Sequence, residues 1–249
     1  MLSRCVSVCM ATYNGELFLS EQIDSILAEL SDQDELVVVD DGSTDSTINL
    51  LSSYATKDAR VKLTRNTRNM GVIKTFELAL SKAQNEIIFL ADQDDVWLSG
   101  RVSACLDIFD KYPQVSAVLV NAEILAFDQR TGVSFYTAGS EPKLSIISQL
   151  YKNEFIGCCM CFRKSILKVA LPFASGISMH DWWLGCCALL AGNVYFLNDN
   201  KIHYRRHSSN ASPSSRRDLY TVFKSRMKDI ACFVELLVRR FGQGFKRVK

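Results

Sequence analysis

Several patterns that would point at once to a familiar kind of nucleotide site are missing from this chain of 249 residues. No GxGxxG follows the first apolar run and no GxxxxGK[ST] loop occurs anywhere, which excludes the two commonest glycine-rich phosphate sites. The stretch "DQDDVWLSGRV" does not supply the regular oxygen ligands and central glycine of an EF-hand loop. The nucleotide sites that remain open to this chain use acidic residues and a metal ion.

Long apolar runs and internal repeats are also missing. No apolar run reaches the roughly 18 residues that a membrane span needs. The start, "MLSRCVSVCMATYNG", leads straight into periodic sequence, so we interpret it as a first strand and not as a cleaved signal. With 48% hydrophobic and 22% charged residues the chain has a globular composition, and its length suits one large α/β domain or a domain with a C-terminal extension.

The nine cysteines form no metal or disulfide pattern. They lie in apolar runs such as "CVSVCM", "GCCMCF" and "LGCCALL", where adjacent cysteines cannot easily bridge each other and no CxxC pair faces a second one. We therefore favour small buried side chains in a reducing cytoplasm over a disulfide framework or a zinc site.

The net charge of +2 is unevenly distributed along the chain. From Arg216 to the end, ten basic residues against three acidic ones give a charge of +7, which leaves −5 for the preceding body. This asymmetry indicates a basic appendage on a mildly acidic catalytic or binding body.

Short apolar runs alternate with helical patterns through the first half. Strands are expected at residues 5–11, 34–43, 61–66 and 86–95, and helices at residues 17–30, 43–51 and 72–83. This alternation predicts an α/β fold with a mostly parallel sheet flanked by helices. The second half is less regular, with strand-like runs at 116–127 and 193–207, a strand leading into a helix at 155–167, and a helix at 180–192. After a Ser-rich break at 208–217, residues 218–249 predict one or two basic amphipathic helices.

Polar clusters follow each strand expected in the first half: "ATYNGE", "DDGSTD", "RNTRNMG" and "ADQDD". In parallel sheets covered by helices, ligands bind beyond the carboxyl ends of the strands. The last cluster is the most unusual, because Asp92, Asp94 and Asp95 would repel one another unless they are protonated or bound to a cation. Such oxygen ligands suit Mg²⁺ or Mn²⁺ that bridges phosphates. An ordinary acidic turn is the alternative.

The acidic end of the second strand has two interpretations. Asp40 and Asp41 either introduce the turn and cap the next helix, or accept hydrogen bonds from a nucleobase and a ribose hydroxyl. The two residues alone do not decide between these roles.

Four stretches together resemble the family 2 glycosyltransferases of the GT-A fold: "VSVCMATYNGELFLSEQIDSIL", "ELVVVDDGSTDST", "NMGVIKTFELAL" and "FLADQDDVW". With "HDWW" and "YRRHSSN", the stretch "DQDDVW" is most similar to the bacterial rhamnosyltransferase-like branch. Each motif is weak alone, so their order and spacing carry the resemblance, which extends to Asn210. It implies a GT-A domain over 1–212, with a nucleotide-sugar half at 1–98 and an acceptor half at 99–212, and a basic amphipathic helical tail at 213–249.

The resemblance also implies roles for the matching positions. Those expected to hold the base and ribose are Ala11, Thr12, Tyr13 and Asp41; those near the nucleotide or its phosphates are Asn69, Gly71 and Lys74. Asp92 would face the ribose or the sugar.

On the metal side, the resemblance implies that Asp94 binds Mn²⁺ or Mg²⁺ on the diphosphate and that His207 completes the metal shell. Asp40 and Asp95 would support this site. Displacing a nucleoside diphosphate from the anomeric carbon of a sugar builds negative charge on the leaving oxygen, and a metal there stabilises that charge.

The expected catalytic base is Asp181 of "HDWW", with a helix N-cap as the alternative. Many family members have Glu-Asp where this chain has His180 and Asp181, so the role of His180 is left open. Trp182 and Trp183 would either stack on sugar faces or belong to the core. Arg206 would contact the diphosphate or form a surface pair.

The basic tail has two candidate roles. Its mixture of apolar and cationic residues would suit the anionic inner face of the cell membrane, where a lipid-linked acceptor is found. It could equally pack on the body or against a second copy in a homo-oligomer. Nucleic-acid binding is disfavoured, because no aromatic-basic recognition motif accompanies the charge.

Taken together, these features predict a cytoplasmic, metal-dependent, inverting glycosyltransferase that uses a dTDP- or UDP-sugar. Its acceptor would be a saccharide or lipid-linked oligosaccharide of a bacterial surface polysaccharide such as O-antigen or capsule, with rhamnose from dTDP-rhamnose as one candidate sugar. A sugar-nucleotide pyrophosphorylase is a rival, although "MATYNGE" lacks the glycine-rich basic loop expected of one. A non-catalytic, membrane-peripheral scaffold of the same fold is a second rival.

Overall fold

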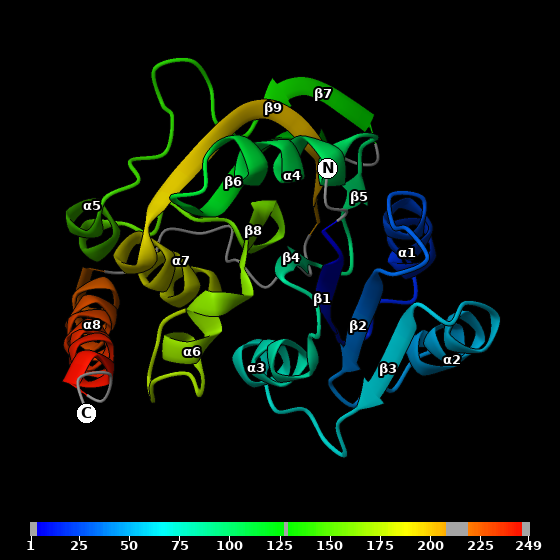
Figure 1. Ribbon diagram of the computed structural model, residues 1–249. Helices are drawn as coiled ribbons and strands as arrows, with labels where there is room; N and C mark the ends of the chain where they lie inside the picture. Colours follow the sequence, from blue (N-terminus) through cyan, green and yellow to red (C-terminus); the bar gives the residue numbers. More distant parts are fainter. Residues whose placement is uncertain (1–3, 127–128, 208–218, 246–249) are drawn as a thin grey trace.

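The computed structural model describes residues 4–126, 129–207 and 219–245 (Figure 1). The first part of the chain forms β1 (Val6–Thr12), α1 (Leu19–Leu27), β2 (Glu35–Asp40), α2 (Thr47–Lys57), β3 (Val61–Arg65), α3 (Val72–Lys82) and β4 (Ile87–Ala91). The second part forms β5 (Val96–Trp97), α4 (Arg101–Lys111), β6 (Val115–Ala126), β7 (Gln129–Ser134), α5 (Ile146–Tyr151), η1 (Gly157–Cys159), β8 (Met160–Arg163), η2 (Lys164–Ile166), α6 (Leu167–Ala170), α7 (His180–Ala191), β9 (Asn193–Arg206) and α8 (Leu219–Phe245).

Within these described ranges, nine strands form one mixed sheet with the order β3-β2-β1-β4-β8-β6-β9-β5, and β7 pairs with β6 beside this path. The first four strands pair in parallel. β8 pairs antiparallel with β4 and β6, and β9 pairs in parallel with β6. The predicted α/β fold is confirmed, and the antiparallel pairs all involve strands that follow β4 in the chain.

The apolar pattern of the first half explains why these segments form a buried sheet. Every residue of β2 is buried, as expected for a parallel strand that is covered on both faces. On α1, Leu19, Ile23 and Ile26 recur at helical spacing and are fully buried. The sheet and the helices therefore enclose one continuous core.

The turn after β2 differs from the helix expected at 43–51, because α2 begins only at Thr47. Its amides bond to side chains instead of to a helical turn: Ser43 donates to Asp40, and Thr44 donates to Asn14. This bonding holds the end of β2 against the end of β1, where parallel strands open toward a ligand site.

Helix α8 lies at one edge of the molecule, beside α5 and α6 and far from the β1–β3 side of the sheet (Figure 1). Among the side chains of α8 that the structure describes, the buried ones are Asp229, Cys232 and Leu236, which face the body. Across the described residues, none of the helices combines the length and the apolar character that a membrane span requires.

Candidate active site

One cavity of about 370 Å³ lies where the carboxyl ends of β1 and β4 meet η1 and the start of α7. Ten of the residues predicted for the site line it: Ala11, Thr12, Tyr13, Asp41, Asn69, Gly71, Asp92, Asp94, His180 and Asp181. Residues that are more than 160 positions apart in the chain are thus brought to one cavity.

Asp41 joins the cavity wall to the loop after β3. Its carboxylate accepts hydrogen bonds from the backbone amides of Met70 and Gly71 and from Nδ2 of Asn66, each at 2.8 Å. Asp41 therefore fixes the loop that carries Asn69 and Gly71 as well as lining the cavity. Asp40 is fully buried beneath it and accepts hydrogen bonds from Ser43, so it supports the turn.

The acidic turn after β4 is held from three sides. Nε2 of Gln22 on α1 donates to the backbone oxygen of Asp92 at 2.6 Å. The side-chain amide of Gln93 accepts from the backbone amide of Tyr13 at 2.8 Å and donates to its oxygen at 3.1 Å. Arg205 of β9 donates from Nε to the backbone oxygen of Asp94 at 2.8 Å. These bonds fix the positions from which the three carboxylates project.

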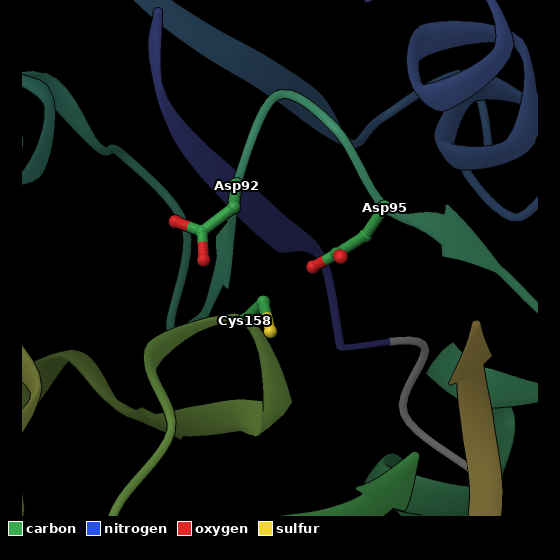
Figure 2. Close-up of side chains that lie close together, drawn as sticks. All are labelled: Asp92, Asp95 and Cys158. Carbon is green, nitrogen blue, oxygen red and sulfur yellow. The ribbon is translucent and has the colours of Figure 1, made fainter. Parts of the chain in front are cut away.

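Asp92 and Asp95 lie on the two arms of this turn, with Cys158 of η1 opposite them (Figure 2). One potential ligand atom from each of the three side chains lies within 4.8 Å of the others. Burial, together with the charges of Asp95, Asp94 and Asp181, raises the pKa of Asp92 well above its usual range. Burial and the charge of Asp94 raise the pKa of Asp95 to about 7. The cluster therefore favours a proton or a cation.

A buried arginine partly offsets this negative charge from behind. Arg101 of α4 is 1% exposed, and its guanidinium lies 3.9 Å from the ring centre of Trp97. It donates to the backbone oxygen of Cys158, and its charge lowers the pKa of Asp95. Arg101 thus makes a carboxylate at this depth less costly.

The two residues predicted to bind the metal are in direct contact. Nε2 of His207 lies 2.8 Å from Oδ2 of Asp94, and the imidazole stacks on Phe18 with ring centres 4.9 Å apart. A carboxylate oxygen and an imidazole nitrogen are both ligands that Mn²⁺ accepts. The donor pair of Asp94 and His207 therefore fits one divalent cation.

Asp181 lies in the first turn of α7, where burial raises its pKa to about 6. Its Oδ1 accepts hydrogen bonds from Nδ2 of Asn153 at 3.0 Å and from the backbone amide of Trp182 at 2.6 Å. The N-cap position belongs to Met179, so Asp181 is not the cap that the alternative interpretation expected. A fixed carboxylate with this pKa can accept a proton at neutral pH.

The family model "Glycosyl transferase family 2" matches residues 7–170, which is more than half of the chain. The chain belongs to glycosyl transferase family 2. The resemblance to family 2 is therefore confirmed, and so is the glycosyltransferase class that it implied, while similarity to the rhamnosyltransferase-like branch stays a prediction.

The chain is also similar to three known proteins. It is 27% identical over 232 residues to WfgD of Escherichia coli, a UDP-Glc:alpha-D-GlcNAc-diphosphoundecaprenol beta-1,3-glucosyltransferase, and the match covers 92% of this chain and 87% of WfgD. The structure of S. aureus TarS 1–349 in complex with UDP-GlcNAc has a TM-score of 0.69 at 22% identity, covering 95% of this chain and 72% of that one. PcManGT of Pyrobaculum calidifontis, in complex with GDP-Man and Mn²⁺, has a TM-score of 0.61 at 20% identity, covering 99% and 65%.

The two structures show that the fold is shared with GT-A enzymes whose complexes contain nucleotide sugars. The curated relatives are longer than this chain, which spans 66% of the length of one from Nostoc sp. and 87% of WfgD.

Seven residues predicted for this family 2 site are not in the lining of the cavity. Three of them, Asp40, Asp95 and His207, contact or adjoin residues that are, and the other four are Lys74, Trp182, Trp183 and Arg206. Trp182 and Trp183 are fully buried and donate from Nε1 to backbone oxygens at 2.9 Å, so stacking on a sugar is contradicted and the core alternative holds. Lys74 forms an ion pair with Glu77 on its own helix. Arg206 is exposed on β9, where its guanidinium lies 5.9 Å from the ring centre of Phe135.

Sequence reasoning missed several residues of the site. Gln93 stood between two predicted aspartates, and its place inside "DQDD" was the available signal. Gly157 lines the cavity, and a Cβ there would lie 3.0 Å from Nε2 of His180. Asn153, which orients Asp181, and Arg101, which lies behind Asp95, carried no signal in their surrounding sequence.

Proposed function

We propose that this family 2 chain is an inverting, metal-dependent glycosyltransferase that moves a sugar from a nucleotide donor to the hydroxyl of a saccharide acceptor. The observation that carries the proposal is that one cavity contains both the acidic turn, with Asp94 in contact with His207, and the carboxylate of Asp181. A group that holds the diphosphate and a group that accepts a proton are the two requirements of this reaction.

The nucleotide would lie over the ends of β1 and β2, against Thr12, Tyr13 and the loop fixed by Asp41. Asp94 and His207 would hold a divalent cation, which when bound supplies positive charge to the diphosphate. Asp92 would face the sugar or the ribose. Each of these contacts uses a side chain or loop that the surrounding hydrogen bonds fix before a ligand arrives.

Asp181 would act as the base at the acceptor side. As the acceptor oxygen forms its bond to the anomeric carbon, the bond from that carbon to the diphosphate breaks and the hydroxyl proton passes to a carboxylate oxygen of Asp181. Inversion at the anomeric carbon follows from this single displacement. Asn153 and the amide of Trp182 keep the carboxylate oriented.

For the sugar and acceptor, we propose a UDP- or dTDP-sugar, with rhamnose as one candidate, and a saccharide or lipid-linked oligosaccharide of a bacterial surface polysaccharide. The name of WfgD includes a diphosphoundecaprenol acceptor, which supports the lipid-linked alternative by similarity. Such an acceptor would place the enzyme on the cytoplasmic face of the membrane.

The outer face of α8 supports a membrane contact. Its outward apolar side chains recur at spacings of three and four residues and are 40–67% exposed: Met227, Ile230, Val234 and Val238. Lys224 and Lys228 are exposed on the same helix, while Cys232 and Leu236 face the body. One face of α8 packs on the body, and the other combines apolar and cationic groups as interfacial helices do.

The test of the proposal is release of nucleoside diphosphate from UDP-glucose, UDP-N-acetylglucosamine, dTDP-rhamnose and GDP-mannose, with Mn²⁺, with Mg²⁺ and with EDTA. Metal-dependent release from one donor is the expected result. Consumption of nucleoside triphosphate and sugar phosphate with release of pyrophosphate would instead identify a pyrophosphorylase. Nucleotide binding without turnover on saccharide acceptors would identify a scaffold.

A further inference from the structure

His180 lines the cavity, yet neither of its ring nitrogens has a hydrogen-bond partner among the described residues. The side chain is nevertheless 4% exposed, so bulk water does not surround it. Buried polar atoms in folded proteins are almost always paired, and an unpaired one at a cavity wall indicates that its partner arrives with a ligand.

The surroundings of His180 fix the ring and leave it polar but uncharged. It stacks on Phe76 of α3, with ring centres 4.0 Å apart and an interplanar angle of 18°. Burial lowers its pKa to about 3, so the imidazole is neutral at physiological pH. A neutral imidazole offers one N–H donor and one nitrogen acceptor.

Gly157 of η1 gives Nε2 of His180 its space, since a Cβ there would lie 3.0 Å from that nitrogen. Asp181, the adjacent residue, faces the same cavity and has its own hydrogen bonds to Asn153 and Trp182. His180 is thus a free donor and acceptor beside the base but not bonded to it.

Building on the proposed function, we propose that His180 is a specificity-determining residue that binds a hydroxyl of the saccharide held next to Asp181. A sugar hydroxyl both donates and accepts, as a neutral imidazole does, whereas an ionised phosphate oxygen only accepts and would leave the acceptor nitrogen of the imidazole unpaired. The hydroxyl belongs either to the transferred sugar of the donor or to the acceptor, and the two sources give different kinetic results.

The test compares His180→Phe, which keeps an aromatic ring on Phe76 but removes both nitrogens, with His180→Gln, which restores a donor and an acceptor. The matched control is His203→Phe, because His203 lies on β9 outside the cavity. Calorimetry measures Kd for UDP-glucose, UDP-N-acetylglucosamine and dTDP-rhamnose against UDP and dTDP alone. Nucleoside diphosphate release is followed with and without a mixture of alkyl glycosides.

If His180 binds the donor sugar, His180→Phe weakens binding of the preferred sugar nucleotide about tenfold or more and leaves Kd of its nucleoside diphosphate unchanged. A donor whose sugar lacks the one hydroxyl that His180 binds should then bind wild type and His180→Phe with equal Kd. If it binds the acceptor, donor binding and hydrolysis are unchanged and glycoside-stimulated turnover falls by a similar factor. In both cases His180→Gln recovers part of the loss and His203→Phe behaves like wild type.

The inference is overturned if His180→Phe matches wild type in every measure, or weakens the sugar nucleotide and the bare nucleoside diphosphate equally, as a purely structural role would. Failure of wild type to bind any donor of the panel would instead refute the proposed function, and the inference with it.

Discussion

At the scale of single residues, the chemistry of the site depends on carboxylates whose surroundings differ. Asp181 has two donors on one oxygen and a pKa raised by burial, whereas Asp94 contacts an imidazole. In the sequence, Asp92, Asp94, Asp95 and Asp181 are chemically alike, and only packing gives them different surroundings. Each role leads to a separate expectation.

The pH dependence of kcat/KM should report the state of Asp181. A base must be deprotonated, so with a pKa of about 6 the rate is full above neutrality and falls as pH drops through 6. Asp181→Asn should lower kcat by about 10²- to 10⁴-fold and leave nucleotide binding intact. A variant that kept wild-type transfer would remove Asp181 from the role of base.

Asn153 offers a more selective test of the same carboxylate. Its hydrogen bond to Oδ1 favours the ionised form of Asp181, so Asn153→Ala should raise the pKa and move the acidic limb of the profile to higher pH. The loss of rate should be larger at pH 6 than at pH 8. An equal loss at both pH values would mean that Asn153 acts on folding and not on the base.

Substitution of the predicted metal ligands should weaken binding of the cation and leave binding of the nucleobase unchanged. Asp94→Ala and His207→Ala are expected to weaken Mn²⁺ binding, measured by calorimetry in the presence of UDP, by about tenfold to 100-fold. Asp107→Ala, at an exposed aspartate of α4, is the control. Unchanged Mn²⁺ affinity in both ligand variants would place the metal elsewhere.

At the scale of elements, the strand–helix rhythm predicted β1 to β4 and α1 and α3, because parallel strands and their helices leave strong apolar periods. The order of strands beyond β4 left no such signal, since β8, β6 and β9 pair through contacts far apart in the chain. The burial of the two tryptophans of α7 also left no clear signal in the sequence. Their helix is apolar on nearly all sides and therefore buried, a feature that the HDWW motif alone concealed.

Helix α8 carries the prediction that belongs to this scale. Val234→Asp, on its outward stripe, should lower binding to vesicles containing phosphatidylserine about tenfold or more, because an apolar contact is lost and an anion is added. Val133→Asp, at a valine of β7 with 49% exposure against 54% for Val234, is the matched control. A dimer that dissociates in Val234→Asp, with no vesicle binding by wild type, would assign this face to a second copy.

At the scale of the whole molecule, the site exists only where two parts of the chain meet. The acidic turn after β4 and the η1–α7 segment line the cavity together, and Arg205 of β9 and His207 hold the acidic turn through Asp94. The motifs predicted which residues would be present, but their separation of more than 100 positions meant that the fold alone could bring Asp94 to His207. Ligands that bridge these segments should therefore bind the folded chain and not the unfolded one.

This linkage gives a prediction for thermal stability. UDP at about 100-fold above its Kd, with Mn²⁺, should raise Tm by about 5–10 °C, and by more than the sum of the shifts with either alone. EDTA should abolish the excess, because Asp94 and His207 would contact the diphosphate only through a bound cation. Asp94→Ala should show the shift of UDP alone, and Asp107→Ala the full one. Additive shifts in wild type would mean that nucleotide and metal bind independently, which would contradict a cation held between the diphosphate and Asp94.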